Sequence, residues 1–257
     1  MSLPAILAAA TREPGRLSAE IPPGWMQGRT TYGGLSTALA FEVAAGSATS
    51  LPPLRAAQIA FIGPVHGTVE AVARVERQGR NATWIRSELR CDGQLALAAT
   101  FVFMGRVASV IELDKLPLPS GLIPPEDAPL VTDDGPAFLD NLETRRAVPK
   151  GEEGLGTALC WVRLKERAGL PAFTHILAVG DGLPPGARTM MAKRAPVSSM
   201  MWQIGLLTDQ PETRDGWWLM RSAADFARNG CSTQAMHIWN RDGVPVVSGA
   251  QSIALFG

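Results

Sequence analysis

The sequence predicts an α+β protein made of two similar units, each a long antiparallel β-sheet wrapped around one buried helix. Three observations carry this prediction. A helix with almost no polar face lies near the N-terminus, several strand-like runs follow it, and the same order of elements returns after residue 155. A repeated unit of one helix and an antiparallel meander is more specific than a general mixture of helices and strands.

The apolar helix is expected within RTTYGGLSTALAFEVAAG, residues 29–46. From Leu35 onward its only polar side chains are Ser36, Thr37 and Glu42, so apolar groups cover almost every direction. A helix that is apolar all round is surrounded by protein. Its roughly 11 to 14 residues are too few to span a bilayer, which takes roughly 20. We therefore expect a core helix.

The runs after this helix change from a period near 3.6 to a period of 2, which indicates strands. The clearest hairpin is ELRCDGQLAL, where Asp92 and Gly93 are the residue types that a type I′ turn requires. One face of the sheet should be wet, because charged side chains alternate with mainly apolar ones in the strand before this turn. The expected strands are 54–62, 67–77, 82–90 and 95–105.

A proline-rich, acidic stretch separates the two units. It contains LDKLPLPSGLIPPEDAPLVTDDGP, a composition typical of an exposed connection. We expect an N-terminal unit at 1–106, a linker at 107–154 and a C-terminal unit at 155–257. The second unit should hold a strand at 157–167, a helical or helix-entry segment at 171–183 and four further strands, and we expect Asp181 near the start of the second helix.

Two anchors align the repeats. The pair Asp242-Gly243 lies 150 residues after Asp92-Gly93, and at this offset Thr83 meets Thr233 without a gap. A sheet curled around an apolar helix is the hotdog architecture, and two copies in one chain make a tandem, or double, hotdog.

Charge and cysteine content exclude several functions. The 257 residues hold 24 Lys plus Arg and 24 Asp plus Glu, so no overall field recruits nucleic acid or an anionic membrane. The cysteines Cys91, Cys160 and Cys231 show no C-x-x-C spacing and fit a reducing compartment. LPAILAAA at 3–10 lacks the basic start of a signal peptide, so we expect a short helix in a cytoplasmic protein.

Three segments outside the linker carry a resemblance to a known family: GRTTYGGLSTALAFEVA, FIGPVHGTVEAVARVERQGRNATWIRSELRCDGQLALAATFVF and RDGVPVVSGAQSIALFG. With the region around Asp181 they cover most of the chain, and in combination they resemble the type II acyl-CoA thioesterases, a double-hotdog family. The resemblance implies hydrolysis of acyl-CoA to a free acid and CoA. In that family an aspartate, a threonine or serine, and a glutamine surround the attacking water.

The resemblance assigns these roles by position. The aspartate falls on Asp181 in AVGDGLPP, and the glutamine falls on Gln251 in VSGAQSIAL. The hydroxyl position departs from the family, because it falls on Pro196, which has neither a hydroxyl nor a backbone N–H. Strand periodicity places Ser198 about 7 Å further along on the same face, which makes it the substitute, with Ser199 on the opposite face.

Each candidate also has a plain structural explanation. An aspartate before glycine is an ordinary cap or turn residue, and Gln251 in its apolar strand can simply bond a neighbouring backbone. Gly33 and Gly34 can offer an N–H to an oxyanion at the helix N-terminus, with Gly34 the expected donor. They can equally allow a tight turn into a helix that leaves no room for Cβ atoms.

Other side chains stay unassigned. Arginines of the second and third strands can meet CoA phosphates or cover a wet face. Large side chains of the second unit can shape an acyl pocket, although core packing explains most of them. The arginines are Arg74, Arg77, Arg80, Arg86 and Arg90, and the large residues are Trp202, Trp217, Trp218, Met200, Met201 and Met220.

The leading hypothesis is an acyl-CoA thioesterase of fatty acid metabolism that needs no metal or redox cofactor. The chain has no G-x-S-x-G elbow, no H-E-x-x-H and no Walker A motif. The alternative is an acyl-CoA or fatty-acyl binding protein that has lost hydrolysis through Pro196. The expected partner is acyl-CoA, with no nucleic acid and no stable membrane insertion. Acyl length and a possible homo-oligomer stay open.

Overall fold

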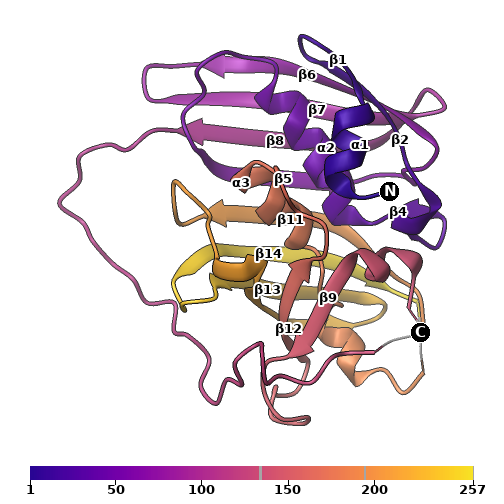
Figure 1. Ribbon diagram of the computed structural model, residues 1–257, viewed down its shortest axis with the longest axis vertical. Helices are drawn as coiled ribbons and strands as arrows, with labels where there is room; N and C mark the ends of the chain where they lie inside the picture. Colours follow the sequence, from indigo (N-terminus) through magenta and orange to yellow (C-terminus); the bar gives the residue numbers. More distant parts are fainter. Residues whose placement is uncertain (133–134, 194, 257) are drawn as a thin grey trace.

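The computed structural model describes residues 1–132, 135–193 and 195–256. One antiparallel sheet of twelve strands dominates the structure, in the order β1-β2-β6-β7-β8-β5-β11-β14-β13-β12-β10-β9. The N-terminal half of the sheet is uppermost in Figure 1, and the two halves meet where β5 lies beside β11. This arrangement confirms the predicted α+β double hotdog.

The N-terminal half wraps around the predicted core helix, α2 (Gly33–Ala45). Every residue of α2 except Glu42 and Ala45 is buried, which accounts for its lack of a polar face. Both residues of the predicted type I′ turn, Asp92 and Gly93, have positive φ. The other elements are α1 (Leu3–Ala9), β1 (Thr11–Glu13), β2 (Arg16–Glu20), η1 (Pro23–Trp25), β3 (Met26–Gln27), β4 (Thr30–Thr31), β5 (Leu54–Phe61), β6 (Thr68–Gln78), β7 (Ala82–Cys91) and β8 (Gln94–Met104).

The C-terminal half repeats this plan around a shorter helix, α3 (Ala172–Val179). Two elements of the C-terminal half, η2 and β9, lie within the predicted 107–154 linker, and β9 pairs with β10 at the edge of the sheet. The elements are η2 (Ala137–Asn141), β9 (Leu142–Arg146), β10 (Thr157–Leu164), η3 (Gly186–Met190), β11 (Val197–Leu206), η4 (Arg214–Gly216), β12 (Trp218–Arg228), β13 (Cys231–Asn240) and β14 (Pro245–Leu255).

Two matching β-bulges define how the repeats correspond. Both halves show the same strand order when read from the outer edge inward, so β6 corresponds to β12 and β7 to β13. The β6 bulge at Glu76 follows the residue that pairs with Ile85. The β12 bulge at Asp225 follows the residue that pairs with Gln234. Ile85 and Gln234 therefore occupy equivalent positions.

This correspondence corrects the predicted alignment by one residue. Thr83 is equivalent to Ser232 rather than to Thr233, and the side chains of Thr83 and Ser232 are both buried. The alignment shifts because the second hairpin has a longer turn. The Asn240 N–H donates to the Val244 carbonyl, so three residues, 241–243, connect its strands. The first hairpin connects its strands with two residues.

The paired tryptophans near the start of β12 take opposite faces, as predicted. Trp218 belongs to the main core, whereas Trp217 joins a second apolar cluster with Trp161 and Trp239. The Trp161 indole N–H donates to the Ile123 carbonyl at 2.8 Å, so this cluster anchors the connection between the halves. Within the described residues, no helix is long and apolar enough to cross a membrane.

Candidate active site

A cavity of about 2570 Å³ opens between the two hotdogs. Its walls are the β3–β4 hairpin, the N-terminus of α2, the loop after β5, η2 with β9, the segment after α3, and the start of β11. Typical ligand pockets measure roughly 300–1,000 Å³, so this cavity can take a ligand much larger than a metabolite of ordinary size.

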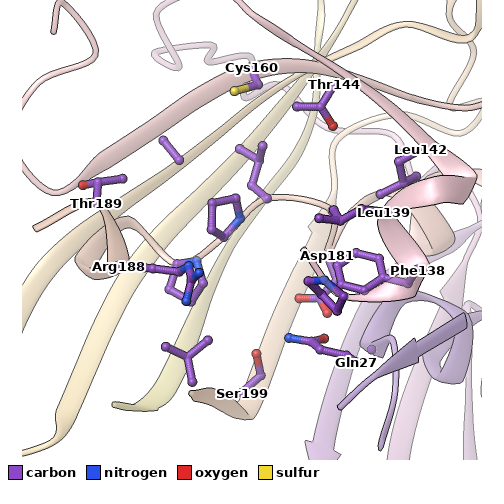
Figure 2. A pocket seen from close by; sticks show the side chains of 18 of the residues that line it. Gln27, Phe138, Leu139, Leu142, Thr144, Cys160, Asp181, Arg188, Thr189 and Ser199 are labelled. Carbon is purple, nitrogen blue, oxygen red and sulfur yellow. The ribbon is translucent and has the colours of Figure 1, made fainter. Parts of the chain in front are cut away.

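Asp181 points into this cavity from the segment that follows α3 (Figure 2). The expectation that Asp181 lies near the start of the second helix is wrong. The helix ends at Val179, and the Gly180 N–H closes its last turn on the Ile176 carbonyl at 2.9 Å. The half-buried carboxyl group faces the N-terminus of α2, where a Cβ atom on Gly33 would overlap its Oδ2 atom.

Burial dominates the acidity of Asp181. It raises the pKa of the carboxyl from its usual 3.8 to about 7, against the opposing effect of a hydrogen bond from Gln251. Burial, and then the nearby charge of Asp181, also raise the pKa of Tyr32 well above 10.0. Asp181 can therefore exchange a proton near neutral pH, while Tyr32 stays neutral.

Gln251 lies beside Asp181, as the resemblance implied. Its side chain belongs to the inner face of β14 and is buried, and its Nε2 donates to Asp181 Oδ1 at 2.8 Å. Across the sheet, Gln251 pairs with Trp202 of β11 and Gln234 of β13. The structure thus brings together two of the residues predicted for the site, one from a loop and one from a rigid strand.

Ser199, rather than the expected substitute Ser198, shares a face of the sheet with Gln251. A bulge at Met200 shifts the register, so Ser199 pairs with Ile253 on the inner face that carries Gln251. Ser198 is exposed and pairs with Ala254 on the other face. Figure 2 shows the Ser199 side chain directed into the same cavity as Asp181. Ser198 and Ser199 still alternate, but the bulge separates them from Trp202, so Ser199 and not Ser198 shares the face of Trp202 and Gln251.

The two glycines of α2 have different surroundings. Gly33 lies against Asp181, whereas a Cβ on Gly34 would overlap the Ala178 carbonyl and the Tyr32 ring. Gly34 therefore allows α2 and α3 to pack closely. Tyr32 precedes the helix without a side-chain capping bond, so the first N–H groups of α2 are left for a ligand.

An aromatic stack closes one side of the site. The Tyr32 and Phe138 rings lie parallel with centroids 4.3 Å apart, and the Tyr32 hydroxyl donates to the Ala178 carbonyl at 2.9 Å. The Asn141 side chain also donates to the Gly24 carbonyl at 2.7 Å. These contacts dock η2, which the sequence analysis assigned to a linker, onto the N-terminal hotdog.

Gln234 was missed by the sequence analysis. It is buried on β13, and its Nε2 donates to Gln251 Oε1 at 2.8 Å. The signal was available, because STQAMHIWN places Gln234 in one row with Met236 and Ile238, where a buried amide needs partners.

None of the unassigned arginines and large side chains lines the cavity. Arg74 pairs with Glu76, and Arg86 and Arg90 both pair with Glu88 on the wet face of the sheet. The cations on the cavity wall come from other segments, among them Arg29, Lys150 and Arg188. The tryptophans and methionines named above are not among the residues that line it.

The sequence matches two domain families over most of its length. Residues 21–104 match the acyl-CoA thioesterase N-terminal domain, and residues 120–255 match the acyl-CoA thioesterase C-terminal domain. No curated protein sequence matches the chain.

Solved structures show the same fold along the whole chain. A hot dog fold protein of unknown function from Alicyclobacillus acidocaldarius superposes with a TM-score of 0.86 at 19% identity, covering 98% of this chain and 97% of that one. A putative thioesterase II from Thermobifida fusca superposes with a TM-score of 0.83 at 18% identity, covering 99% of this chain and 97% of that one. An acyl-CoA thioesterase II from Mycobacterium marinum superposes with a TM-score of 0.78 at 13% identity, covering 99% of this chain and 98% of that one. With both domain families matched in order, the chain belongs to the acyl-CoA thioesterase family, a family of thioester hydrolases.

Proposed function

We propose that the protein hydrolyses acyl-CoA with a water molecule that Asp181 activates and Gln251 helps to hold. The observation that carries this proposal is the 2.8 Å hydrogen bond between the Gln251 amide and the Asp181 carboxyl, made at the wall of the large cavity. A carboxyl group with a pKa of about 7 is well matched to general base catalysis near neutral pH.

The reaction needs one base and one acid, and Asp181 can serve as both. As base it takes a proton from the water, whose oxygen bonds to the thioester carbon while the carbonyl electrons move onto the carbonyl oxygen. When this tetrahedral intermediate collapses, the C–S bond breaks and the sulfur takes the proton back from Asp181. The products are the free acid and CoA-SH, and the carboxylate is restored.

The N-terminus of α2 is the proposed oxyanion site. The Gly33 and Gly34 N–H groups belong to the first turn, which has no capping side chain, and the helix dipole favours negative charge there. Gly33 also lies against Asp181, so the oxyanion and the base would be neighbours. Ser199, on the inner face of β11, is the hydroxyl group that best fits the role the family gives to a threonine or serine.

The cavity suits a substrate with a long polar handle. Apolar side chains of η2 and β9, including Phe138, Leu139 and Leu142, offer a surface to the acyl group. Arg29, Lys150 and Arg188 can neutralise the phosphates of CoA. The three cysteines are free, which supports a reducing, cytoplasmic setting, and a role in fatty acid metabolism follows from the substrate class.

The second candidate is an acyl-CoA binding protein that does not hydrolyse its ligand. Pro196 favours it, because the position that carries a hydroxyl in the family has none here. The two functions differ in what Asp181 does. A catalytic base is needed for turnover and little for affinity, whereas a binding protein shows no turnover in any variant.

The test is release of free thiol from a panel of acyl-CoAs, from acetyl to palmitoyl and including phenylacetyl. Wild type is compared with Asp181→Asn and with Asp242→Asn, a matched control on an exposed turn that does not line the cavity. We expect wild type and the control to turn over substrate, with rates that decrease at pH values below about 7 because Asp181 becomes protonated. The rate of Asp181→Asn should be at least about 10²-fold lower.

The binding alternative predicts a different set of results. Wild type would release no thiol from any member of the panel, while an acyl-CoA would still raise the melting temperature of wild type and Asp181→Asn alike. Turnover in Asp181→Asn equal to that of wild type would refute the proposed base.

A further inference from the structure

A chain of hydrogen bonds continues from the catalytic pair into the interior of the C-terminal hotdog. Gln251 Oε1 accepts from Gln234 Nε2 at 2.8 Å. Gln234 Oε1 in turn accepts from the Ser222 hydroxyl at 2.8 Å and from the Gly186 backbone N–H at 2.9 Å. The Ser222, Gln234 and Gln251 side chains are only 0%, 1% and 3% exposed, so water does not compete for these bonds.

The direction of this chain is determined at its inner end. A backbone N–H can only donate, so the atom of Gln234 that faces Gly186 must be the oxygen. The Gln234 Nε2 atom then faces Gln251 and requires an acceptor, which is Gln251 Oε1. The Gln251 Nε2 atom is left to face Asp181 as a donor.

The opposite orientation of Gln251 would change the chemistry at Asp181. A carbonyl oxygen turned toward the carboxyl group can only accept, so its partner would have to be protonated. A protonated Asp181 cannot take a proton from water. The orientation of the Gln251 amide, two hydrogen bonds away from the Gly186 backbone N–H, thus decides whether the carboxyl group is held in its basic form.

We propose that Gln234 is a positioning residue that fixes the polarity of the Gln251 amide, so that Gln251 donates to the Asp181 carboxylate. This inference rests on the proposed function only for its effect on turnover. The orientation of the two amides can be measured whether or not the protein hydrolyses acyl-CoA.

The N-terminal hotdog shows that the fold itself does not require these amides. At the position of Gln234 it has Ile85, and at the position of Gln251 it has Phe101, the residue with which Ile85 pairs. Both of these side chains are buried and apolar. The buried pair Gln234 and Gln251 therefore has no counterpart at the equivalent positions of the N-terminal hotdog.

Several charged or titratable side chains share the cavity wall with Asp181, and besides Arg188 and Glu143 they are Arg29, His66, Asp140, Arg145, Arg146, Lys150, Glu153 and Lys165. Tyr32 lies at the start of α2 and is neutral, because burial raises the pKa of its hydroxyl well above 10.0. Arg188 on η3 donates to the Ala195 carbonyl, and Glu143 on β9 is paired with arginines. Among the described residues, none of these three side chains pairs with Asp181. Loss of the Gln251 donor should therefore change the pKa of Asp181.

The first experiment measures kcat/KM against pH, from about 5 to about 9, for wild type and three variants. Gln234→Met keeps the side-chain length and removes both hydrogen-bonding atoms. Ser222→Ala removes one of the two donors to Gln234 but leaves the Gly186 N–H. The matched control is Gln203→Met, the same substitution at an exposed position of β11.

We expect Gln234→Met to move the acid limb of the profile upward by about half to one pH unit, because the donor to the carboxylate is no longer held in place. Ser222→Ala should leave the limb nearly unmoved, since the backbone donor still sets the polarity, and Gln203→Met should match wild type. A purely structural role would lower kcat/KM at every pH without moving the limb. An unmoved limb in Gln234→Met, or an equal shift in Ser222→Ala, would overturn the proposal.

The second experiment needs neither turnover nor a variant. NMR of the wild-type protein follows the Asp181 carboxyl carbon and the side-chain amide signals of both glutamines as pH changes. We expect the Gln251 NH₂ signals to titrate with Asp181 and the Gln234 NH₂ signals to exchange slowly with water. If the Gln251 NH₂ signals do not respond to Asp181, the assigned polarity is wrong, even where Gln234→Met does not fold. If wild type lacks turnover but these signals behave as expected, the proposed function fails and the positioning role stands.

Discussion

Replacement of Gly33 by alanine should inactivate the enzyme at a small cost in stability. The added Cβ would lie well inside van der Waals contact of Asp181 Oδ2 and 3.1 Å from the Phe61 ring. Gly33 is the first residue of α2, and its φ is not in the left-handed region, so the backbone itself accepts alanine. The carboxyl group is the part that must move.

The size of the effect follows from how far it must move. Ordinary contact requires the carboxyl oxygen to withdraw by about 1 Å, and a displacement of that size in a catalytic group can cost about 10²-fold in rate. Withdrawal also stretches the 2.8 Å bond from Gln251 beyond hydrogen-bonding distance. Losing that bond costs about 1.5–3 kcal/mol, partly offset by up to about 1 kcal/mol from replacing a helical glycine.

Alanine at the adjacent Gly34 provides the matched comparison. There the new Cβ would overlap the Ala178 carbonyl, which belongs to the backbone of α3 and cannot turn aside as a side chain can. We expect about 3 kcal/mol or more of destabilisation from this overpacking. Neighbouring positions should thus separate a defect in rate from a defect in folding.

The assay combines urea unfolding with kcat measured on the best substrate of the panel. Gly33→Ala should lower kcat about 10²-fold and the free energy of unfolding by about 1–2 kcal/mol, and Gly34→Ala should show the larger loss of stability. The reasoning is refuted if Gly33→Ala keeps wild-type kcat, or if it is less stable than Gly34→Ala.

Three further predictions concern the same site. Because burial raises the Asp181 pKa from 3.8 to about 7, the carboxyl favours the folded state below the lower value and loses that contribution as pH rises through the higher one. In thermal unfolding, Asp181→Asn should therefore stabilise the protein by about 1–2 kcal/mol near pH 8 and give no gain near pH 4. The full pKa shift corresponds to roughly 4 kcal/mol, and the expected gain is smaller because the group is half-buried. Ser199→Ala should lower kcat at least about 10-fold and Ser198→Ala should leave it unchanged; equal effects would contradict the bulge assignment. Phe138→Ala removes the stack on Tyr32 and should cost about 3–5 kcal/mol in urea unfolding if η2 is an integral part of the fold.

The fold was predictable because its signals are local. The apolar helix, the period-2 strands and the Asp92-Gly93 turn can each be recognised within about a dozen residues. The segment at 107–154 was harder to interpret. Its proline content describes the connection after β8, but β9 is an edge strand that gains its partner only through pairing with β10. A short edge strand has little local signal of its own.

The site was predictable only in part, for a similar reason. Asp181 and Gln251 came from the resemblance, and their separation of 70 residues gives no hint of contact without it. The serine positions required knowledge of the bulge at Met200, which depends on how β11 pairs with β14 rather than on its own residues. Register is set between strands, so a sequence read one strand at a time cannot place these hydroxyls.

The near-symmetry of the two hotdogs places a second contact between a helix start and an acid within the described residues. At the start of α2, Gly33 lies against Asp181, an acid that follows α3. At the start of α3, Thr174 contacts Glu42, an acid near the end of α2. At the second position Thr174 donates to Glu42, and Arg12 pairs with the same carboxyl at 3.1 Å. This carboxylate is therefore already engaged by a cation and a hydroxyl, and unlike Asp181 it does not line the cavity. The scaffold therefore supplies two equivalent junctions of helix and acid, and the side chains around each decide which one can do chemistry.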